Sequence, residues 1–304
     1  MENKINFKDL LGPMRVPFLL LPPMCVLLGI GTAYWTTGKV NILYAVLALI
    51  GAVSSHISVN AFNEYFDFKS GLDTKTPKTP FSGGSGTLPA RPELARSALA
   101  TASVSLLIPT LIGLYFLVVR GPAILPIGIL GIVLVVTYTT WITHNPILCL
   151  FAPGLGFGTL WVMGTNFVLT GGYSWTAFTA SLVPFFLVSN LLLLNQFPDV
   201  EADRSVGRRH LPILLGRQAS SYIYVAFLAC TYLSIISGYL LGVLPAWALM
   251  GLLTLLLAIP AGLGAVRYNQ DIQKLMPAMG MNVLINLLTP LLVAVGLFIA
   301  RALT

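Results

Sequence analysis

The sequence contains few charged residues. Only 9% of its 304 residues are charged, with ten Asp and Glu, three His and three Cys in all, whereas an ordinary soluble domain carries about 25% charged residues. Hydrophobic residues make up 56% of the chain, which argues against a soluble protein with a few buried helices. The cysteines, Cys25, Cys149 and Cys230, all fall within apolar stretches, and their spacing suggests neither a metal site nor a disulfide.

Apolar runs of roughly 20 residues, the length that an α-helix needs to cross a bilayer, recur along the whole chain. They predict an all-α, polytopic membrane protein with nine transmembrane helices in a bundle around a central, cytoplasm-facing cavity. The first run has full span length and follows charges of both signs, so we expect no signal peptide. The predicted spans are roughly 16–36, 42–66, 97–118, 121–141, 147–170, 176–197, 219–241, 244–266 and 276–300.

The distribution of Lys and Arg predicts the orientation in the membrane. Cytoplasmic loops of membrane proteins are enriched in basic residues, and nine spans with a cytoplasmic N-terminus put all but three of the 17 Lys and Arg residues on that side. The three exceptions are Lys39, Arg120 and Arg301. We therefore expect a prokaryotic plasma-membrane protein with its N-terminus and long loops in the cytoplasm and its C-terminus outside. The net charge of +7 needs no nucleic acid partner to explain it.

Six of the ten acidic residues lie in two short stretches, each at the end of an apolar run. The first stretch covers residues 63–73, and the second covers residues 195–203. Carboxylates at the edge of a bilayer are costly unless something compensates their charge, so such clusters indicate function. The six residues are Glu64, Asp67, Asp73, Asp199, Glu201 and Asp203.

Helical spacing places the polar side chains of each stretch on one face, because residues three or four apart share a helix face. The stripe in the first stretch consists of His56, Asn60, Asn63 and Asp67. Asp73 lies beyond the helix-breaking Gly71 and must fold back from the loop to join them. In the second stretch, Asn195, Asp199 and Asp203 share a face.

Together the two stretches offer four carboxylates and two amide oxygens. This set suits Mg²⁺, which prefers oxygen ligands and keeps some waters that a phosphate can replace, and it does not suit zinc, which is bound mainly by His and Cys. Ordinary capping of two helices at a membrane edge remains the alternative explanation, and two matched stretches followed by basic loops make it the weaker one. The predicted metal ligands are Asn63, Asp67, Asp73, Asn195, Asp199 and Asp203.

Each acidic stretch is followed by a long basic loop. Lys and Arg side chains beside a divalent cation indicate a phosphorylated substrate, since both offset the charge of a departing diphosphate. The rest of the site is apolar and lies within the bilayer, so a diphosphate with a hydrocarbon tail, a polyprenyl diphosphate, fits both parts. The arrangement of span, acidic end and basic loop occurs after the second and the sixth span. It suggests that residues 1–304 form a single domain of two related four-helix halves plus a ninth helix.

The paired motifs resemble the signature of the UbiA-type intramembrane prenyltransferases. Segments 15–19, 23–29, 207–216 and 281–297 also resemble that family, so the similarity covers nearly the whole chain. The five-residue gap before Asp73 is typical of the menaquinone branch, which prenylates 1,4-dihydroxy-2-naphthoate. Four features depart from the family: Glu64 stands where Asp is common, His210 replaces a common Thr, segment 138–146 lacks the usual Lys or Arg, and segment 154–158 lacks the Glu that usually follows its Gly-Leu-Gly. These departures concern the acceptor more than the chemistry.

The resemblance implies a mechanism and residue roles. Two Mg²⁺ ions, bound by the six predicted ligands, would neutralise the diphosphate as it leaves, with Asp67 and Asp199 expected to be catalytic. The ring of Tyr138 would face the allylic cation, although an aromatic at the membrane interface is an alternative role for it. Arg15 would contact the diphosphate or an acceptor carboxylate, or serve only as a topogenic charge. The residues expected to bind diphosphate oxygens are Lys75, Lys78, Arg208 and Arg209.

Two other classes of function remain as alternatives. A transporter with an intramembrane cation site would place its acids nearer the bilayer midplane and would need no diphosphate-binding loops. A CDP-alcohol phosphotransferase would carry an Asp-x2-Asp-Gly-x2-Ala-Arg pattern, which this sequence does not contain. The expected partners are therefore a polyprenyl diphosphate, an aromatic acceptor and the lipid bilayer, with no obligatory protein partner. The acceptor is 1,4-dihydroxy-2-naphthoate, another quinone precursor or a less usual lipid.

Overall fold

The computed structural model describes residues 7–76 and 79–304, and these ranges contain helices and loops but no β-strand. The all-α prediction is therefore confirmed for the described chain. The longer helices are α2 (Leu21–Thr37), α3 (Ile42–Lys69), α5 (Ala95–Arg120), α6 (Leu125–Thr137), α8 (Trp161–Thr170), α9 (Trp175–Asn195), α12 (Gly216–Leu240), α13 (Leu255–Arg267) and α14 (Ile272–Ala302). The shorter ones are α1 (Phe7–Met14), α4 (Thr87–Ala90), α7 (Pro146–Pro153), α10 (Val200–Ser205) and α11 (Leu211–Leu214).

Short 3₁₀ and π turns extend or join these helices. A π-helical segment, Gly154–Leu160, links α7 to α8, so that Pro146–Thr170 is one continuous helical span. The 3₁₀ turns are Val16–Leu20, Leu72–Thr74, Pro92–Leu94, Pro122–Ile124, Ile142–His144 and Ala246–Thr254. Among the described residues, eight helices are long and apolar enough to cross a membrane. In place of the predicted span 121–141 there is a shorter apolar helix, Pro122–Thr137.

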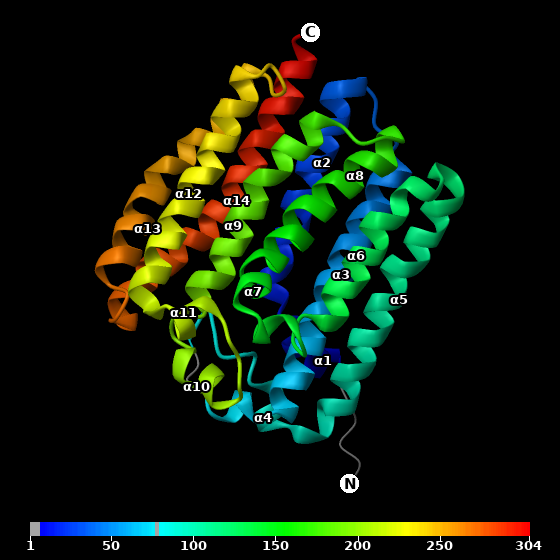
Figure 1. Ribbon diagram of the computed structural model, residues 1–304. Coiled ribbons are helices and arrows are strands. Elements are labelled where there is room, and N and C mark those ends of the chain that lie inside the picture. Colours follow the sequence, from blue (N-terminus) through cyan, green and yellow to red (C-terminus); the bar gives the residue numbers. More distant parts are fainter. Residues whose placement is uncertain (1–6, 77–78) are drawn as a thin grey trace.

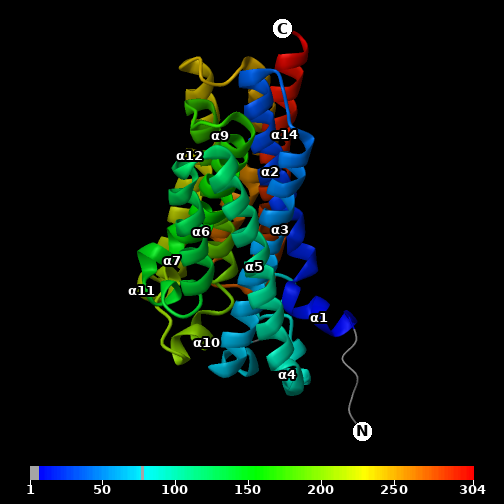
Figure 2. The same cartoon turned by 90° about the vertical axis from the view of Figure 1, so that its right-hand side faces the viewer.

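The helices form an elongated bundle (Figures 1 and 2). The short helices α1, α4, α10 and α11 gather towards one end of it, and the C-terminus lies at the other (Figure 1). We call the first of these the loop end, defined by residues 71–76, 79–94 and 196–215. Both acidic stretches lie there, because α3 and α9 each end at it. The fold thus brings together two stretches that are far apart in sequence.

Polar caps define where several helices begin. Asn41 accepts a hydrogen bond from the backbone N–H of Tyr44 at 3.1 Å at the start of α3. Ser174 does the same for Ala177 at 3.1 Å in α9. Such side chains satisfy donors that the first helical turn leaves without partners. At the C-terminal end of α2, Gly38 adopts the left-handed conformation that commonly ends a helix, with φ of 68°.

Glycines allow the tightest helix contacts. Gly154 and Gly158 lie against the backbone of Phe185 in α9, and a Cβ atom added at either position would overlap with it. Small residues at helix interfaces let backbones approach closely, which is a main source of helix association in membranes. The π-helical segment is therefore fixed against α9, and its other residues are left to face the interior of the bundle.

We expect Gly158→Ala to destabilise the protein, because the new methyl group must displace the backbone of Phe185. Overpacking of this kind costs about 1–3 kcal/mol. Gly156→Ala is the matched control: its Cβ would lie 3.8 Å from Leu134, an ordinary contact, and alanine favours helix. Thermal unfolding in detergent should show a lower midpoint for Gly158→Ala alone. Equal midpoints would mean that this contact is not tight.

Candidate active site

A cavity of about 550 Å³ runs through the bundle and reaches the loop end. Its walls come from α3, α5, α6, the segment Gly154–Leu160, α8 and α9, together with residues of both long loops. Nine of the predicted site residues line it: Arg15, Asn63, Asp67, Asp73, Tyr138, Asn195, Asp199, Asp203 and Arg208. Lys75 and Arg209 are exposed and do not line the cavity. Lys78 lies outside the described residues.

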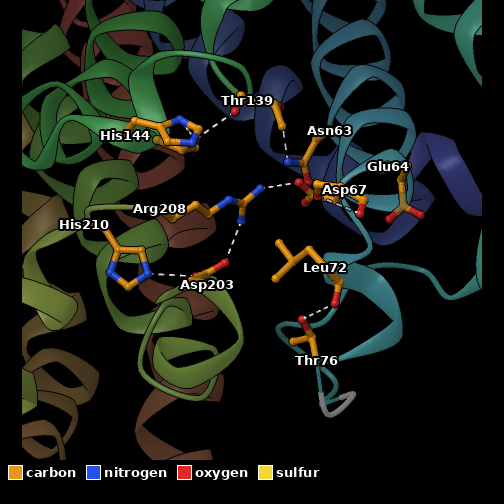
Figure 3. Close-up of polar contacts among 12 residues, drawn as sticks. Asn63, Glu64, Asp67, Leu72, Thr76, Thr139, His144, Asp203, Arg208 and His210 are labelled. Carbon is orange, nitrogen blue, oxygen red and sulfur yellow. Dashed lines mark hydrogen bonds and ion pairs between the residues drawn. The ribbon is translucent and has the colours of Figure 1, made fainter. Parts of the chain in front are cut away.

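The two acidic stretches are joined by one guanidinium group. Arg208 donates through Nη2 to Asp67 Oδ1 in the first stretch, and through Nη1 to Asp203 Oδ1 in the second, at 2.9 Å (Figure 3). All three side chains are largely buried. A buried charge needs a partner to offset the loss of its hydration. Arg208 therefore holds the ends of α3 and α10 together by a paired ionic contact.

A second ionic contact positions the glycine-rich loop, residues 82–86. Arg15 donates to Glu64 Oε1 and to Asn63 Oδ1, both at 2.9 Å. Glu64 is fully buried, and it accepts bonds from the backbone N–H and the hydroxyl of Ser85, at 2.7 and 2.8 Å. This contact brings the loop over the cavity, where Gly84 approaches Asp73: a Cβ at Gly84 would lie 2.9 Å from Asp73 Oδ1.

Three buried oxygen atoms at this end of the cavity have no hydrogen-bond partner among the described residues. They are Asp73 Oδ2, Asn195 Oδ1 and Asp199 Oδ1. Buried polar atoms normally have partners, and each exception calls for an explanation such as an ion. All three belong to the predicted ligand set, and their oxygen chemistry fits Mg²⁺. The donor set therefore fits the expected metal.

The carboxylates are nevertheless spread apart. Within residues 7–76 and 79–304, no group of three or more His, Cys, Asp or Glu side chains is close enough to hold one ion. Arg208 explains part of this arrangement, because its guanidinium lies between Asp67 and Asp203 (Figure 3). Bringing these two carboxylates to a common cation requires Arg208 to move to another anion.

Burial strongly affects the acids outside the membrane spans. It raises the pKa of Asp73 to about 7, and the nearby carboxylates of Glu64 and Asp67 add to the shift. Burial also raises the pKa of Asp199 to about 7, and the nearby charge of Asp203 contributes a smaller increase. At Asp203, burial acts in the same direction, but the hydrogen bond from His210 and the charge of Arg208 outweigh it and hold the pKa below its ordinary value.

Away from the loop end the cavity is apolar and long. It follows α3 from Asp67 to Leu47, twenty residues that correspond to about 30 Å of helix. His56 lies in this part with its ring edge-on to Phe157, the centroids 4.7 Å apart. Gly128 and Ile129 of α6 line this part of the cavity and are also exposed.

Two polar residues with clear contacts here had no role in the sequence prediction. The sequence pattern assigns no individual role to Glu64 or His210, yet both are buried and bonded to site residues. The sequence contains a signal for Glu64, because this acid directly follows the predicted ligand Asn63. If Glu64 did not face the site, its carboxylate would face lipid. The contact of His210 with Asp203 depends on the turn at Gly207, which the sequence does not specify.

Comparison with known proteins identifies the class. The sequence model of the UbiA prenyltransferase family matches residues 23–284, and the chain belongs to this family of membrane-embedded prenyltransferases. Among curated relatives, the 1,4-dihydroxy-2-naphthoate octaprenyltransferase of Bacillus subtilis (strain 168) is 27% identical over 268 residues, covering 86% of this chain and 83% of the relative. The protein of the same name from Escherichia coli (strain K12) is 27% identical, covering 96% and 95%.

Solved structures share the fold. A UbiA homolog from Aeropyrum pernix K1 aligns with a TM-score of 0.71 at 19% identity, over 94% of this chain and 98% of that one. A UbiA homolog from Archaeoglobus fulgidus, bound to GPP and Mg²⁺, aligns with a TM-score of 0.63 at 12% identity, over 97% and 99%. The expectation of an integral membrane prenyltransferase of this family is confirmed.

We expect Asp199→Asn to stabilise the metal-free protein at pH 8 and not at pH 4. The folded state, with a pKa of about 7 at this carboxyl, keeps a proton that the unfolded chain loses at about pH 4. Stability therefore falls as the pH rises through this window. Asparagine has no carboxyl proton to lose, so it removes this loss of stability. The check is thermal unfolding in EDTA, with Asp271→Asn as control, because the pKa of this exposed acid is lowered beside Lys274. A gain at Asp199 that is equal at both pH values would contradict the assignment.

Proposed function

We propose that the protein transfers a polyprenyl group from a polyprenyl diphosphate to an aromatic acceptor, in a reaction that depends on Mg²⁺. The acceptor is 1,4-dihydroxy-2-naphthoate or a related quinone precursor. The observation that carries the proposal is the two-part cavity: partnerless buried oxygens and Arg208 at one end, and a long apolar channel at the other. A diphosphate with a hydrocarbon tail has the same two parts.

The predicted ligand set would hold two Mg²⁺ ions together with the diphosphate. Bound there, the ions supply neutralisation of the negative charge that develops on the leaving group. Asp73, Asn195 and Asp199 offer oxygens that lack protein partners, and Asp67 and Asp203 become available when Arg208 turns away. Asn63 completes the set next to Arg15. Asp67 and Asp199, one from each motif, are the proposed catalytic carboxylates.

Basic residues would bind the oxygens of the diphosphate. Arg208 and Arg15 line the cavity and are the best placed, while Lys75 and Arg209 are exposed at its margin and can reach it by turning their flexible side chains. Lys78 is proposed for the same role from its sequence position alone. Because Arg208 currently pairs with two carboxylates, the diphosphate replaces those partners as it binds.

The reaction then requires three bond changes. The bond between C1 of the prenyl group and its bridging oxygen breaks, the electron pair stays with the diphosphate, and an allylic cation remains. An electron-rich ring carbon of the acceptor forms a bond to C1, and the proton on that ring carbon passes to the released diphosphate. The ring of Tyr138, half-buried beside Cys149 and lining the cavity, would stabilise the cation through its π face, and the apolar walls exclude water that would otherwise trap it.

We further propose that the cavity opens at its polar end to the cytoplasm of a prokaryotic cell. Placing the loop end in the cytoplasm puts nearly all Lys and Arg residues on that side, as the positive-inside rule requires. The shorter helix Pro122–Thr137 would cross the membrane as the ninth span. In this arrangement α3 and α9 are equivalent helices of two four-helix halves, each ending in an acidic motif.

The names of the relatives support the choice of acceptor. Curated proteins matching along most of this chain are named 1,4-dihydroxy-2-naphthoate octaprenyltransferases. At 27% identity they support the substrate class more than the individual acceptor, and a different aromatic or lipid acceptor with the same donor chemistry is the alternative.

In an assay with Mg²⁺, a labelled polyprenyl diphosphate and 1,4-dihydroxy-2-naphthoate, we expect prenylated product and release of diphosphate. Asp67→Asn and Asp199→Asn should lower kcat by at least about 10²-fold, because each removes a charge that the metal needs. Glu201→Gln is the matched control: it lies in the second acidic stretch, but its exposed side chain pairs with Arg204 at 3.2 Å. Its activity should stay close to that of the wild type.

Three outcomes of this assay bear on different parts of the proposal. Product with another aromatic compound but not with the naphthoate would replace the acceptor and keep the chemistry. Equal activity of Asp199→Asn and Glu201→Gln would contradict the assignment of Asp199 to the active site. Failure to ionise any polyprenyl diphosphate in Mg²⁺ would refute the proposed function itself.

The exposed, cavity-lining position of Gly128 in α6 predicts how donor length is tolerated. A Cβ at Gly128 would meet open space, so we expect the indole of Gly128→Trp to narrow the channel at this position. We expect a fall of about tenfold or more in kcat/KM for long donors and little change for geranyl diphosphate. Val118→Trp, at an exposed α5 position away from the cavity, is the control. An equal loss for both donors would place the tail elsewhere.

A further inference from the structure

Asp203 is held by two partners of different kinds. Its Oδ1 accepts from Arg208 Nη1 at 2.9 Å, and its Oδ2 pairs with His210 Nε2 at 2.8 Å. An ionised carboxylate has no proton to give, so the imidazole is the donor in the second bond. Asp203 and His210 are both buried, 3% and 2% exposed, and His210 lies beside Asp203 (Figure 3).

Arg208 and His210 differ in their freedom to leave. The guanidinium of Arg208 sits at the end of a long side chain, lines the cavity and already shares its charge between two carboxylates. His210 also lines the cavity, but its side chain is short and only 2% exposed. Its backbone is also fixed, because its carbonyl accepts bonds from the N–H groups of Ile213 and Leu214 at 3.0 and 3.2 Å at the start of α11.

The chain between them is anchored as well. The backbone N–H of Arg209 donates to the carbonyl of Thr143 at 3.1 Å, which ties the loop to the segment that follows α6. Arg208 can therefore turn its side chain while residues 209 and 210 stay in place. When it does so, Oδ1 of Asp203 loses its partner and Oδ2 keeps one.

We propose that His210 is the positioning residue of the second acidic motif: it fixes Oδ2 of Asp203, so that only Oδ1 exchanges partners when Arg208 turns to the diphosphate. Without His210, the carboxylate would rotate freely on losing Arg208, and its oxygen would be lost from the ligand set for part of the time. Carboxylate ligands are themselves commonly oriented by hydrogen bonds, and removal of such a bond typically costs 10–100-fold in metal affinity. This inference rests on the proposed function.

The test is a titration with Mn²⁺ in the presence of inorganic diphosphate, in which the free ion is measured by electron paramagnetic resonance. We expect His210→Ala to raise the Kd for Mn²⁺ about 10–100-fold. His210→Gln, whose amide can donate from a similar position, should stay within about threefold of the wild type. His144→Ala, at an exposed histidine of the same end, is the control and should not change the Kd.

A kinetic measurement separates positioning from general damage. In the prenyl-transfer assay, His210→Ala should raise the Mg²⁺ concentration needed for half-maximal rate, while the rate at saturating Mg²⁺ falls much less. If His210→Ala does not survive purification, His210→Phe, which keeps a ring without the donor, takes its place in the comparison with His210→Gln. A loss of kcat at saturating Mg²⁺ with no change in the half-maximal concentration would overturn the proposal.

Two binding results would also overturn it. The first is an unchanged Kd for Mn²⁺ in His210→Ala, and the second is a Gln variant as weak as the Ala variant. These results differ from failure of the proposed function, because in both cases the wild-type protein still binds Mn²⁺ with diphosphate and transfers prenyl groups. Absence of prenyl transfer by the wild type, in contrast, removes the function and leaves the Mn²⁺ comparison of the variants as a separate result.

Discussion

Burying carboxylates at one end of a membrane bundle is the constraint on which the rest of the structure depends. Asp67 and Asp203 come from segments far apart in the sequence, and each is tied to Arg208. Their charges repel when the site is empty of cations, so a protein cation must separate them. In the proposed function, the same guanidinium pairs with the diphosphate of the substrate. Under that proposal, a contact that stabilises the resting protein prepares the site for the charge that the substrate brings.

The remainder of the site is arranged around that pair. Arg15 and Glu64 form a second ionic contact that brings Ser85 and the glycine-rich loop over the cavity, and Asp73 enters from the turn that follows Gly71. Beyond these groups the walls become apolar along α3. Separation of a charged end from an apolar end allows one cavity to hold both parts of an amphipathic donor, and it keeps water from the carbon that reacts.

Much of this arrangement could be predicted from the sequence. Helical spacing placed the polar stripe of α3 correctly on one face, and the position of Asp73 beyond a glycine required it to fold back, as it does. The contacts of Glu64 and His210 could not be predicted, because they depend on where residues 85 and 203 lie in folded loops. The shorter helix after Pro122 also differs from the expected span: apolar length alone does not reveal that a helix ends at Thr137.

The exposed, cavity-lining residues of α6 have a consequence for the kinetics of the proposed reaction. Gly128 and Ile129 line the channel and are exposed, so under the proposed function a long tail in the channel can stay in contact with the acyl chains around it. Donor and product of the proposed reaction would then exchange by two-dimensional diffusion within the leaflet. The quantity that governs saturation is therefore the mole fraction of donor in the membrane, and diluting the bilayer with inert lipid slows the reaction at constant bulk concentration.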